Sequence, residues 1–541
     1  MQSKITRRDF LRGSAAGVVG AALSGVFFGI PVLALEDGQA DEYTQAVLDS
    51  TSSESVGDGT VYPSGTFSVN TDYTDETFEY TAVLEETTFP DVYPTDNMTP
   101  MTGEELDTVI AALVSSMTYD EKINMLSMNT DPEDRSGVGY MTGIPRLGVP
   151  ESRMHDGPAG ISTSGDSYVE TTNPPIQLTA SMTWSEDLIY EYGKILGTEH
   201  ASTGSGWQLG TQMDLARTPH WARAKDTFGE DYYLTGQMTM AETRGVQENG
   251  GIAMAKHIGA YSTDGDTLLW IEVDEQTLHT AYLYPFEMAA KNADLASIMG
   301  TYNRLNGYYV SSNKELQIEI LRNMWDWGGA MVPDWGADKE EFSLPLGTTI
   351  SQSNAATIDA GIRSAASQGS MTMDELNECV SRSLYALGVS GYLNLVELDG
   401  NGYVKEEPGR TDPIRFERTY TEDREAGLYD ENNQTALELA EKGIVLLKNE
   451  NAALPLTEED YTGDQSVALI GYGAVNLVGG TGGERSFGVL EYMTTPYESI
   501  VDIVGEDANV TAYGLGNVHG TDIPADYVFH TQQESETVWF R

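Results

Sequence analysis

The stretch Gly328–Glu340, GGAMVPDWGADKE, places a carboxylate and an indole directly after a short apolar run. Residues 330–332 are typical of a buried strand, and Asp334 and Trp335 follow them after one proline. A carboxylate at the end of a buried strand can face a substrate. Aspartate also caps helix N-termini, so the same position has a purely structural interpretation. Taken alone, the stretch leaves both interpretations open.

Two earlier apolar runs end in the same way. Gly250–His257, GGIAMAKH, ends in a lysine and a histidine, and Leu295–Tyr302, LASIMGTY, ends in a tyrosine. Helical patterns separate these runs, and this alternation is typical of parallel strands joined by helices. In a (β/α)8 barrel the active site lies at the carboxyl ends of the strands. The three strand ends therefore predict one shared site, in which Asp334 faces a substrate.

Composition and charge exclude several function classes. The 541 residues include 84 acidic and 30 basic side chains, which gives a formal net charge of −54. Such a surface repels nucleic acid and anionic membranes, so neither is an expected partner. Cys379 is the single cysteine, so neither an intramolecular disulfide nor a cysteine-rich metal site is expected. The length predicts two or three domains.

The N-terminus has the pattern of a twin-arginine export signal. Arg7 and Arg8 precede a small-residue apolar run that ends in a sequence suited to cleavage after Ala34. The alternative is a short membrane anchor with two chance arginines. Elsewhere no apolar stretch reaches the roughly 18 residues needed to span a bilayer. We therefore expect export to the cell surface, the periplasm or the medium, with no membrane contact beyond the signal.

A second α/β domain is expected near the C-terminus. The helical pattern TALELAEKGIVLLKN, residues 435–449, precedes a predicted strand over 466–470 and a glycine-rich loop. That loop lacks the G-x-G-x-x-G spacing and the Lys-Ser/Thr pair of nucleotide-binding loops, so nucleotide binding is disfavoured. The chain ends at Arg541 before a sheet of ordinary size is complete, so we expect a partial domain.

Eight motifs in order, from about residue 117 to 500, resemble the family 3 glycoside hydrolases of the β-glucosidase type. They include RLGVPESRMHDGPAGI, RTPHWARAKDTFGEDYYLTG, AKHIGAY, SIMGTYNRLNG, VPDWGA and AEKGIVLLKNENAALPL. The resemblance implies an α/β fold, a (β/α)8 TIM-like barrel followed by a partial α/β sandwich. The predicted organisation is an export signal over 1–34, an extension over 35–100 rich in Thr, Ser and acidic residues, the barrel catalytic domain over 101–395, a linker over 396–433 and the second domain over 434–541.

The resemblance also implies roles for single residues. Asp334 matches the family's nucleophile, which a retaining glycosidase needs beneath the anomeric carbon. Trp335 would shape the pocket with an aromatic face. The remaining matched positions would bind the sugar, and they are Asp156, Arg223, Lys256, His257, Met299 and Tyr302. Ordinary alternatives exist: Asp156 as a turn residue, His257 as a core histidine and Arg223 as half of a surface ion pair.

This chain departs from the family pattern at several positions. Ser162 and Thr267 stand where arginines are usual, and Gly483 stands where the second-domain loop usually has a serine. The family's acid/base glutamate has no recognisable motif before the last residue. Glu484 and Glu491 are the nearest candidates, although surface solvation explains them as well. The identity of the acid/base is therefore left unknown, and the short C-terminus indicates a truncated or externally completed domain.

The predicted function is an exported, retaining, exo-acting β-glycosidase that hydrolyses terminal β-linked sugars through a glycosyl-aspartate intermediate. The departures leave open a catalytically impaired relative that binds carbohydrate or acts at the cell surface. A third alternative, an acidic structural spacer, fits poorly with the ordered barrel motifs. The chemistry needs no cofactor, and no metal-ligand spacing occurs near these residues. A carbohydrate substrate is the expected partner, and the sequence does not specify the sugar, the linkage or the oligomeric state.

Overall fold

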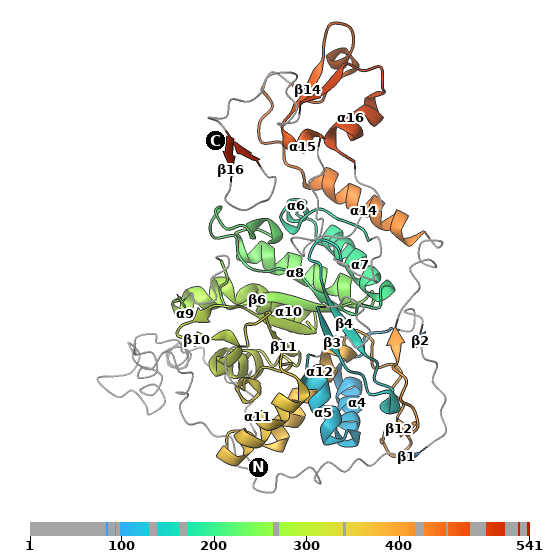
Figure 1. The fold of residues 1–541 in the computed structure, drawn as a ribbon, viewed down its shortest axis with the longest axis vertical. Coiled ribbons are helices and arrows are strands. Elements are labelled where there is room, and N and C mark those ends of the chain that lie inside the picture. The colour runs from blue at the N-terminus through green and yellow to red at the C-terminus, as the bar shows by residue number, and fades with distance from the viewer. Residues whose placement is uncertain are drawn as a thin grey trace, which may run out of the picture. The chain divides into compact units, whose positions relative to one another are not determined.

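In the computed structural model, the described residues are 83–84, 92–93, 98–128, 138–161, 171–262, 270–338, 342–416, 427–450, 453–475, 494–513, 528–530 and 538–540. The chain divides into two compact units. Unit 1 holds residues 1–444 and 482–489, and unit 2 holds residues 445–481 and 490–541. Figure 1 shows the fold, and each unit is described by itself.

The centre of unit 1 is a sheet of α/β type. Its strands lie in the order β11-β8-β6-β5-β4-β3, and neighbours from β11 to β4 run parallel while β3 runs antiparallel to β4. Their bounds are β3 Gly139–Met141, β4 Ser152–Asp156, β5 Trp207–Leu209, β6 Ile252–Ile258, β8 Ser297–Gly300 and β11 Ala330–Pro333. The three strands predicted to carry the site are therefore neighbours, as β6, β8 and β11.

Helices separate the parallel strands along the chain and pack against the sheet (Figure 1). Among the described residues of unit 1, the α-helices are α4 Gly103–Ser116, α5 Tyr119–Leu126, α6 Gln177–Ser181, α7 Glu186–Ser202, α8 Tyr232–Gln247, α9 Glu275–Thr277, α10 Tyr284–Asn292, α11 Ala355–Gln368, α12 Met373–Gly388 and α14 Leu428–Gly443. The same residues include two π-helices, η6 Leu278–Tyr282 and η8 Glu315–Met324, and the short turns η3 Pro145–Leu147, η5 Ala224–Asp226, η7 Val310–Ser312 and η9 Leu344–Leu346.

Side-chain caps and close helix contacts fix where these helices lie. Ser185 accepts the backbone N–H of Leu188 at the start of α7, and Asp231 does the same for α8. The two helices approach closely because α7 has a glycine, Gly193, where they meet. A Cβ at Gly193 would lie 2.3 Å from the Glu242 backbone oxygen, which no side chain tolerates. This contact holds α8 in place before it leads into β6.

Both faces of the sheet are buried, as expected for parallel strands covered by helices. Alternate strand residues enter two hydrophobic clusters. Met254, Met299 and Val332 belong to the cluster that includes α4, α5 and α12. Ile298 and Met331 belong to the cluster that includes α7, α8 and α10. The strands are therefore fixed from both sides, and their carboxyl ends make a rigid base for a site.

Small sheets complete unit 1. β7 Trp270–Ile271, β9 Arg304–Leu305 and β10 Tyr308–Tyr309 form a three-stranded sheet in the order β10-β9-β7. Two parallel pairs join distant segments, β1 Val83–Leu84 with β12 Lys405–Glu406 and β2 Val92–Tyr93 with β13 Arg415–Phe416.

Unit 2 contains a small parallel sheet, which confirms the strand predicted over 466–470. β14 Val467–Ile470 pairs with β15 Val510–Tyr513. The remaining elements are α15 Tyr472–Val475, α16 Pro496–Val504, the turn η11 Glu458–Tyr461 and the antiparallel pair β16 Val528–His530 with β17 Val538–Phe540.

The helix expected over residues 435–449 differs from α14 at both ends. α14 begins at Leu428, inside the range 396–433 predicted as a linker, and ends at Gly443. Ile444 adopts an extended conformation, with φ −75° and ψ 121°, and no helix continues over 444–449. The apolar run IVLLK after the glycine contains β-branched residues, which favour extended structure over helix. The prediction of a helix through Asn449 was therefore wrong.

Candidate active site

Three strands of the sheet end in charged side chains at one edge. Asp156 is the last residue of β4, Lys256 and His257 lie near the end of β6, and Asp334 follows β11 directly. In the register, Lys256 and Val332 both pair with β8, so the ends of β6, β8 and β11 lie level with one another. Parallel strands present their carboxyl ends at the same edge, which brings these side chains together.

Asp334 is the residue around which the site is built. The whole residue is only 8% exposed. One carboxylate oxygen accepts the Trp335 backbone N–H at 2.6 Å, and the other lies 3.3 Å from His257 Nε2. The Tyr302 hydroxyl also donates to the carboxylate. The Trp335 N–H and the Tyr302 hydroxyl therefore hold the carboxylate in one orientation.

Opposing effects act on the ionisation of Asp334. Burial raises its pKa above the ordinary value, and it is the largest effect. The Trp335 N–H, the positive charge of Lys256, the Tyr302 hydroxyl and the charge of Arg223 each lower it. The Asp334 charge in turn adds to burial in raising the pKa of Tyr302, so Tyr302 stays a protonated donor. Burial therefore disfavours the charged form of Asp334, and the surrounding donors and cations favour it.

Asp214 is a residue of this site that the sequence reasoning missed. Its Oδ2 accepts the His257 backbone N–H at 3.1 Å and lies 2.8 Å from His257 Nδ1. Both side chains are almost completely buried. Burial raises the pKa of Asp214 well above its ordinary value, and burial lowers that of His257 well below its own, with the charges of Arg223 and Lys256 adding to the latter effect.

The imidazole of His257 lies between two carboxylates and bonds to one of them, Asp214. A neutral imidazole carries one N–H, and the Asp214 oxygen that already accepts a backbone N–H is the natural acceptor for Nδ1–H. This tautomer leaves Nε2 as an acceptor near Asp334. The 3.3 Å separation from the Asp334 oxygen is longer than an ordinary N–H···O bond, which agrees with this assignment. Asp214 thus orients a ring nitrogen toward the space above Asp334.

Lys256 holds the other side of the site. Its Nζ donates to the Leu209 carbonyl at 2.5 Å and lies 3.6 Å from Asp156 Oδ1. Burial lowers the pKa of Lys256, and the Asp156 charge opposes that shift. The Lys256–His257 peptide bond is cis. Asp156 and Lys256 together supply an acceptor and a donor at one end of the cluster.

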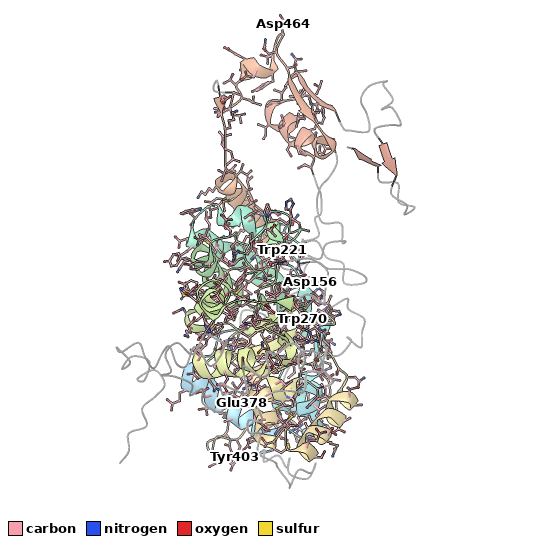
Figure 2. The ribbon with its side chains drawn as sticks, turned by 90° about the vertical axis from the view of Figure 1, so that its left-hand side faces the viewer. Asp156, Trp221, Trp270, Glu378, Tyr403 and Asp464 are labelled. Atoms are coloured by element: carbon pink, nitrogen blue, oxygen red, sulfur yellow. The ribbon has the colours of Figure 1, made fainter. Side chains whose placement is uncertain are left out.

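Arg223 and aromatic rings lie next to His257. The Arg223 guanidinium donates to the Tyr261 hydroxyl, and its carbon lies 5.8 Å from the centre of that ring. Tyr261 makes edge contacts with Trp221 at 5.7 Å and His257 at 5.1 Å between ring centres. Although burial opposes it, the negative charges around Arg223, led by Asp214, raise its pKa. Figure 2 labels Asp156 and Trp221 in this part of unit 1.

The structure gathers most of the predicted site residues and places two of them differently. Asp156, Arg223, Lys256, His257 and Tyr302 all lie within the network around Asp334, as the preceding contacts show. Met299 pairs in register with Lys256 but belongs to the hydrophobic cluster beneath the strand ends. Trp335 is 41% exposed, so its indole lies at the surface beside Asp334.

The structure does not describe the positions that depart from the family pattern or the two glutamates considered for the acid/base. Ser162, Thr267, Gly483, Glu484 and Glu491 lie outside the described residues. Within the described ranges, no group of three or more His, Cys, Asp or Glu side chains could hold a metal ion. Across the same ranges, no helix has the length and apolar character that a bilayer span requires.

Residues 146–384 match the glycosyl hydrolase family 3 N terminal domain. This range contains every residue of the network described above. The chain is 28% identical over 400 residues to the probable beta-glucosidase I of Aspergillus oryzae, covering 71% of this chain and 43% of that protein. It is 29% identical over 379 residues to the thermostable beta-glucosidase B of Acetivibrio thermocellus, covering 67% and 44%. Residues 146–384 of this chain are therefore a glycosyl hydrolase family 3 N terminal domain.

Solved structures of beta-glucosidases resemble this chain. The beta-glucosidase of Kluyveromyces marxianus in complex with glucose has a TM-score of 0.63 at 28% identity, covering 74% of this chain and 46% of that one. DesR, a beta-glucosidase of Streptomyces venezuelae in complex with D-glucose, has a TM-score of 0.62 at 29% identity, covering 77% and 51%. This chain spans less than half the length of the curated relatives it matches.

The export prediction has independent support. Residues 4–24 match the TAT (twin-arginine translocation) pathway signal sequence, and this range includes both arginines that the sequence analysis identified. The chain therefore carries a twin-arginine export signal. The destination beyond the cytoplasmic membrane stays a prediction.

Proposed function

We propose that this family 3 chain is an exported, retaining, exo-acting β-glycosidase of the β-glucosidase type, with Asp334 as its nucleophile. The observation that carries the proposal is the setting of that carboxylate. It follows a buried strand, is held by the Trp335 N–H and the Tyr302 hydroxyl, and lies 3.3 Å from the imidazole of His257. The glucose bound in solved relatives supports a hexose substrate for this chain.

In the proposed reaction, a carboxylate oxygen of Asp334 attacks the anomeric carbon while the bond to the leaving oxygen breaks. The product is a glycosyl-aspartate ester, which water then hydrolyses to release the sugar and regenerate the carboxylate. Asp156, Lys256 and Arg223 offer one acceptor and two charged donors to sugar hydroxyls. His257 Nε2 accepts a hydroxyl proton close to the nucleophile. Trp335 offers a partly exposed aromatic face directly beside Asp334.

We also propose the finer architecture that the motifs imply. The parallel order β4, β5, β6, β8, β11 supports part of a (β/α)8 TIM-like barrel over residues 101–395. A partial α/β sandwich would begin near residue 434, and the β14–β15 pair supports an α/β character for it. The linker over 396–433 would end earlier than its predicted bound, because α14 begins at Leu428.

A second candidate is a relative that binds carbohydrate without turnover. The observation in its favour concerns the acid/base. Among the described residues the carboxylates of the network are Asp156, Asp214 and Asp334, and the first two are engaged with Lys256 and His257. A retaining enzyme needs a second carboxyl about 5 Å from the nucleophile to protonate the leaving oxygen. The acid/base carboxyl group is left unassigned.

Covalent labelling of Asp334 tests the proposal. A fluorosugar with an activated leaving group forms a long-lived glycosyl-enzyme, because the fluorine slows the hydrolysis of the ester more than its formation. We expect mass spectrometry to find the label on the peptide that contains Asp334, and Asp334→Asn to abolish both the label and the turnover of aryl β-glucosides by several orders of magnitude. A label on another carboxylate would refute the assignment.

Asp338→Asn is the matched control. Asp338 is also largely buried, lies four residues further along and accepts a bond from Ser351 Oγ at 2.8 Å. We expect this variant to be labelled like the wild type. Binding of glucose without any label or turnover in the wild type would favour the second candidate.

A further inference from the structure

The three-stranded sheet β10-β9-β7 carries an exposed strip of aromatic and cationic side chains. Arg304 on the central strand β9 pairs in register with Trp270 on β7 and with Tyr309 on β10. Directly paired residues project from the same face of a sheet. Trp270, Arg304 and Tyr309 therefore form one row, which we name the Trp270 strip.

Contacts in the Trp270 strip hold the arginine between the two rings. The guanidinium carbon of Arg304 lies 4.1 Å from the Tyr309 ring centre and 5.3 Å from the Trp270 ring centre. One guanidinium nitrogen donates to the Gly307 carbonyl at 3.3 Å. Trp270 is 47% exposed, so much of its indole faces solvent. The strip is thus a fixed planar donor beside an accessible aromatic face.

The opposite face of the same sheet is buried. Leu305 is completely buried and Ile271 packs against the core cluster that contains β6 and β8 residues. Asn306 fastens the sheet through bonds in both directions with the backbone of Val273, at 2.9 and 3.1 Å. The apolar face therefore explains why the sheet folds, and it leaves the Trp270 strip without a packing role against the core.

The Trp270 strip lies close to the proposed nucleophile along the chain. Tyr302, which donates to Asp334, precedes Arg304 by two residues, a span of about 7 Å at most. Asn303 between them donates to the Gly259 carbonyl at 2.9 Å, which ties this segment to the end of β6. The Tyr302 ring also lies 6.3 Å from the Tyr261 ring beside His257. The central strand of the strip therefore begins two residues after Tyr302, a member of the network around Asp334.

We propose that the Trp270 strip binds the leaving-group portion of a glycan substrate, one that extends away from Asp334 as a β-linked oligosaccharide. The inference rests on the proposed glycosidase function. The network around Asp334 is charged and mainly buried, which suits the binding of one terminal ring. The solvent-facing indole of Trp270 fits the apolar C–H face of a following ring, and Arg304 offers planar donors to its hydroxyls.

A purely structural role makes a different prediction. Cross-strand cation–π pairs stabilise small sheets, so their loss would lower the melting temperature and affect every substrate equally. A binding role affects substrates according to the size of the leaving group. The two roles are separated by comparing glucosyl fluoride, whose leaving group is a single atom, with a β-linked gluco-oligosaccharide.

The test uses the full chain with Trp270→Ala and Arg304→Gln. We expect kcat/KM for the oligosaccharide to fall roughly 3- to 10-fold in each variant, the range of one aromatic contact, while kcat/KM for glucosyl fluoride stays within twofold. Tyr403→Ala is the control, because Tyr403 is 42% exposed and Figure 2 shows it far from Asp156 within unit 1. We expect it to change neither value.

A binding measurement keeps this inference separate from the proposed function. In the Asp334→Asn background, calorimetry measures the binding of the oligosaccharide. Adding Trp270→Ala should raise the dissociation constant 3- to 10-fold. If the wild type hydrolyses neither substrate, the proposed function fails while this comparison still decides the strip. Equal losses on both substrates, or unchanged oligosaccharide binding, would overturn the proposal.

Discussion

Asp214 offers a sharp test of how this site is organised, because it acts through His257 and not through the substrate. Its Oδ2 receives two bonds, the His257 backbone N–H at 3.1 Å and the imidazole Nδ1 at 2.8 Å. We expect Asp214→Asn to reduce catalysis without unfolding the chain. The amide keeps the shape of the side chain but removes the negative charge that orients the ring.

The size of the effect follows from the two bonds. A hydrogen bond to a charged group contributes about 1.5–3 kcal/mol, against about 0.5–1.5 kcal/mol for a neutral pair. The substitution therefore weakens the interaction that orients His257 by roughly 1–2 kcal/mol. With about 1.4 kcal/mol per factor of ten in rate, kcat/KM for an aryl β-glucoside should fall roughly 5- to 30-fold.

A double-mutant cycle with His257→Ala shows whether the effect passes through the imidazole. If Asp214 works only by orienting His257, its substitution should cost little once the ring is absent, so the two losses should be strongly non-additive. Glu406→Gln is the matched control, since Glu406 is a completely buried carboxylate whose partner Arg146 lies outside the site. We expect that variant to lose stability and to keep its kcat/KM.

The reasoning on Asp214 would be refuted by either of two results. Asp214→Asn within twofold of the wild type would show that the charge is not needed to orient the ring. Additive losses in the cycle would show that Asp214 contributes without His257.

Two further predictions concern export and stability. Replacing Arg7 and Arg8 with lysine should leave unprocessed precursor in the cytoplasm, which fractionation and immunoblotting would detect; normal export would point to another signal. Glu199 is completely buried, where burial raises its pKa from 4.5 to about 7 against bonds from Thr172 and Asn432. Between pH 4.5 and 7 the folded chain therefore holds a proton that the unfolded chain has lost, so rising pH lowers stability, by up to about 3 kcal/mol. Glu242 is also completely buried with a pKa raised to about 7, so Glu199→Gln should reduce the decline in urea unfolding of unit 1 between pH 5 and pH 8 without abolishing it; an unchanged decline would contradict the reasoning.

Sequence periodicity predicted the part of the site that lies on strands. Lys256, His257 and Asp334 follow apolar runs, and a carboxyl strand end is a position that parallel-sheet topology defines. Asp156 and Arg223 came only from the motif resemblance, because neither follows a strand pattern that was recognised. Tyr302 was found in both ways. The structure adds how these side chains contact one another, which no spacing rule gives.

Asp214 was missed because it lies in a loop after β5, a strand of only three residues. Its flanking residues, Met213 and Leu215, are both buried, and a carboxylate between two buried apolar residues was the signal available in the sequence. The end of α14 was also misplaced. Apolar periodicity continues past Gly443, and the prediction gave it more weight than the β-branched Ile444 that follows. The close approach of Gly443 to the Thr179 carbonyl is a tertiary contact that the sequence does not show.

The charges of the site explain why its residues depend on one another. Burial raises the pKa of Asp334 and of Asp214. Burial also lowers the pKa of Lys256, although the charge of Asp156 opposes that shift. Burial therefore favours the neutral form of each of these groups. Arg223 and Lys256 each lower the pKa of Asp334 without a direct bond to it in the network. A nucleophile must be ionised to attack, so these two cations serve the proposed chemistry even before they meet a sugar hydroxyl. In the proposed mechanism, substrate binding and ionisation of Asp334 therefore depend on the same two positive charges, so we expect a change at either cation to affect both.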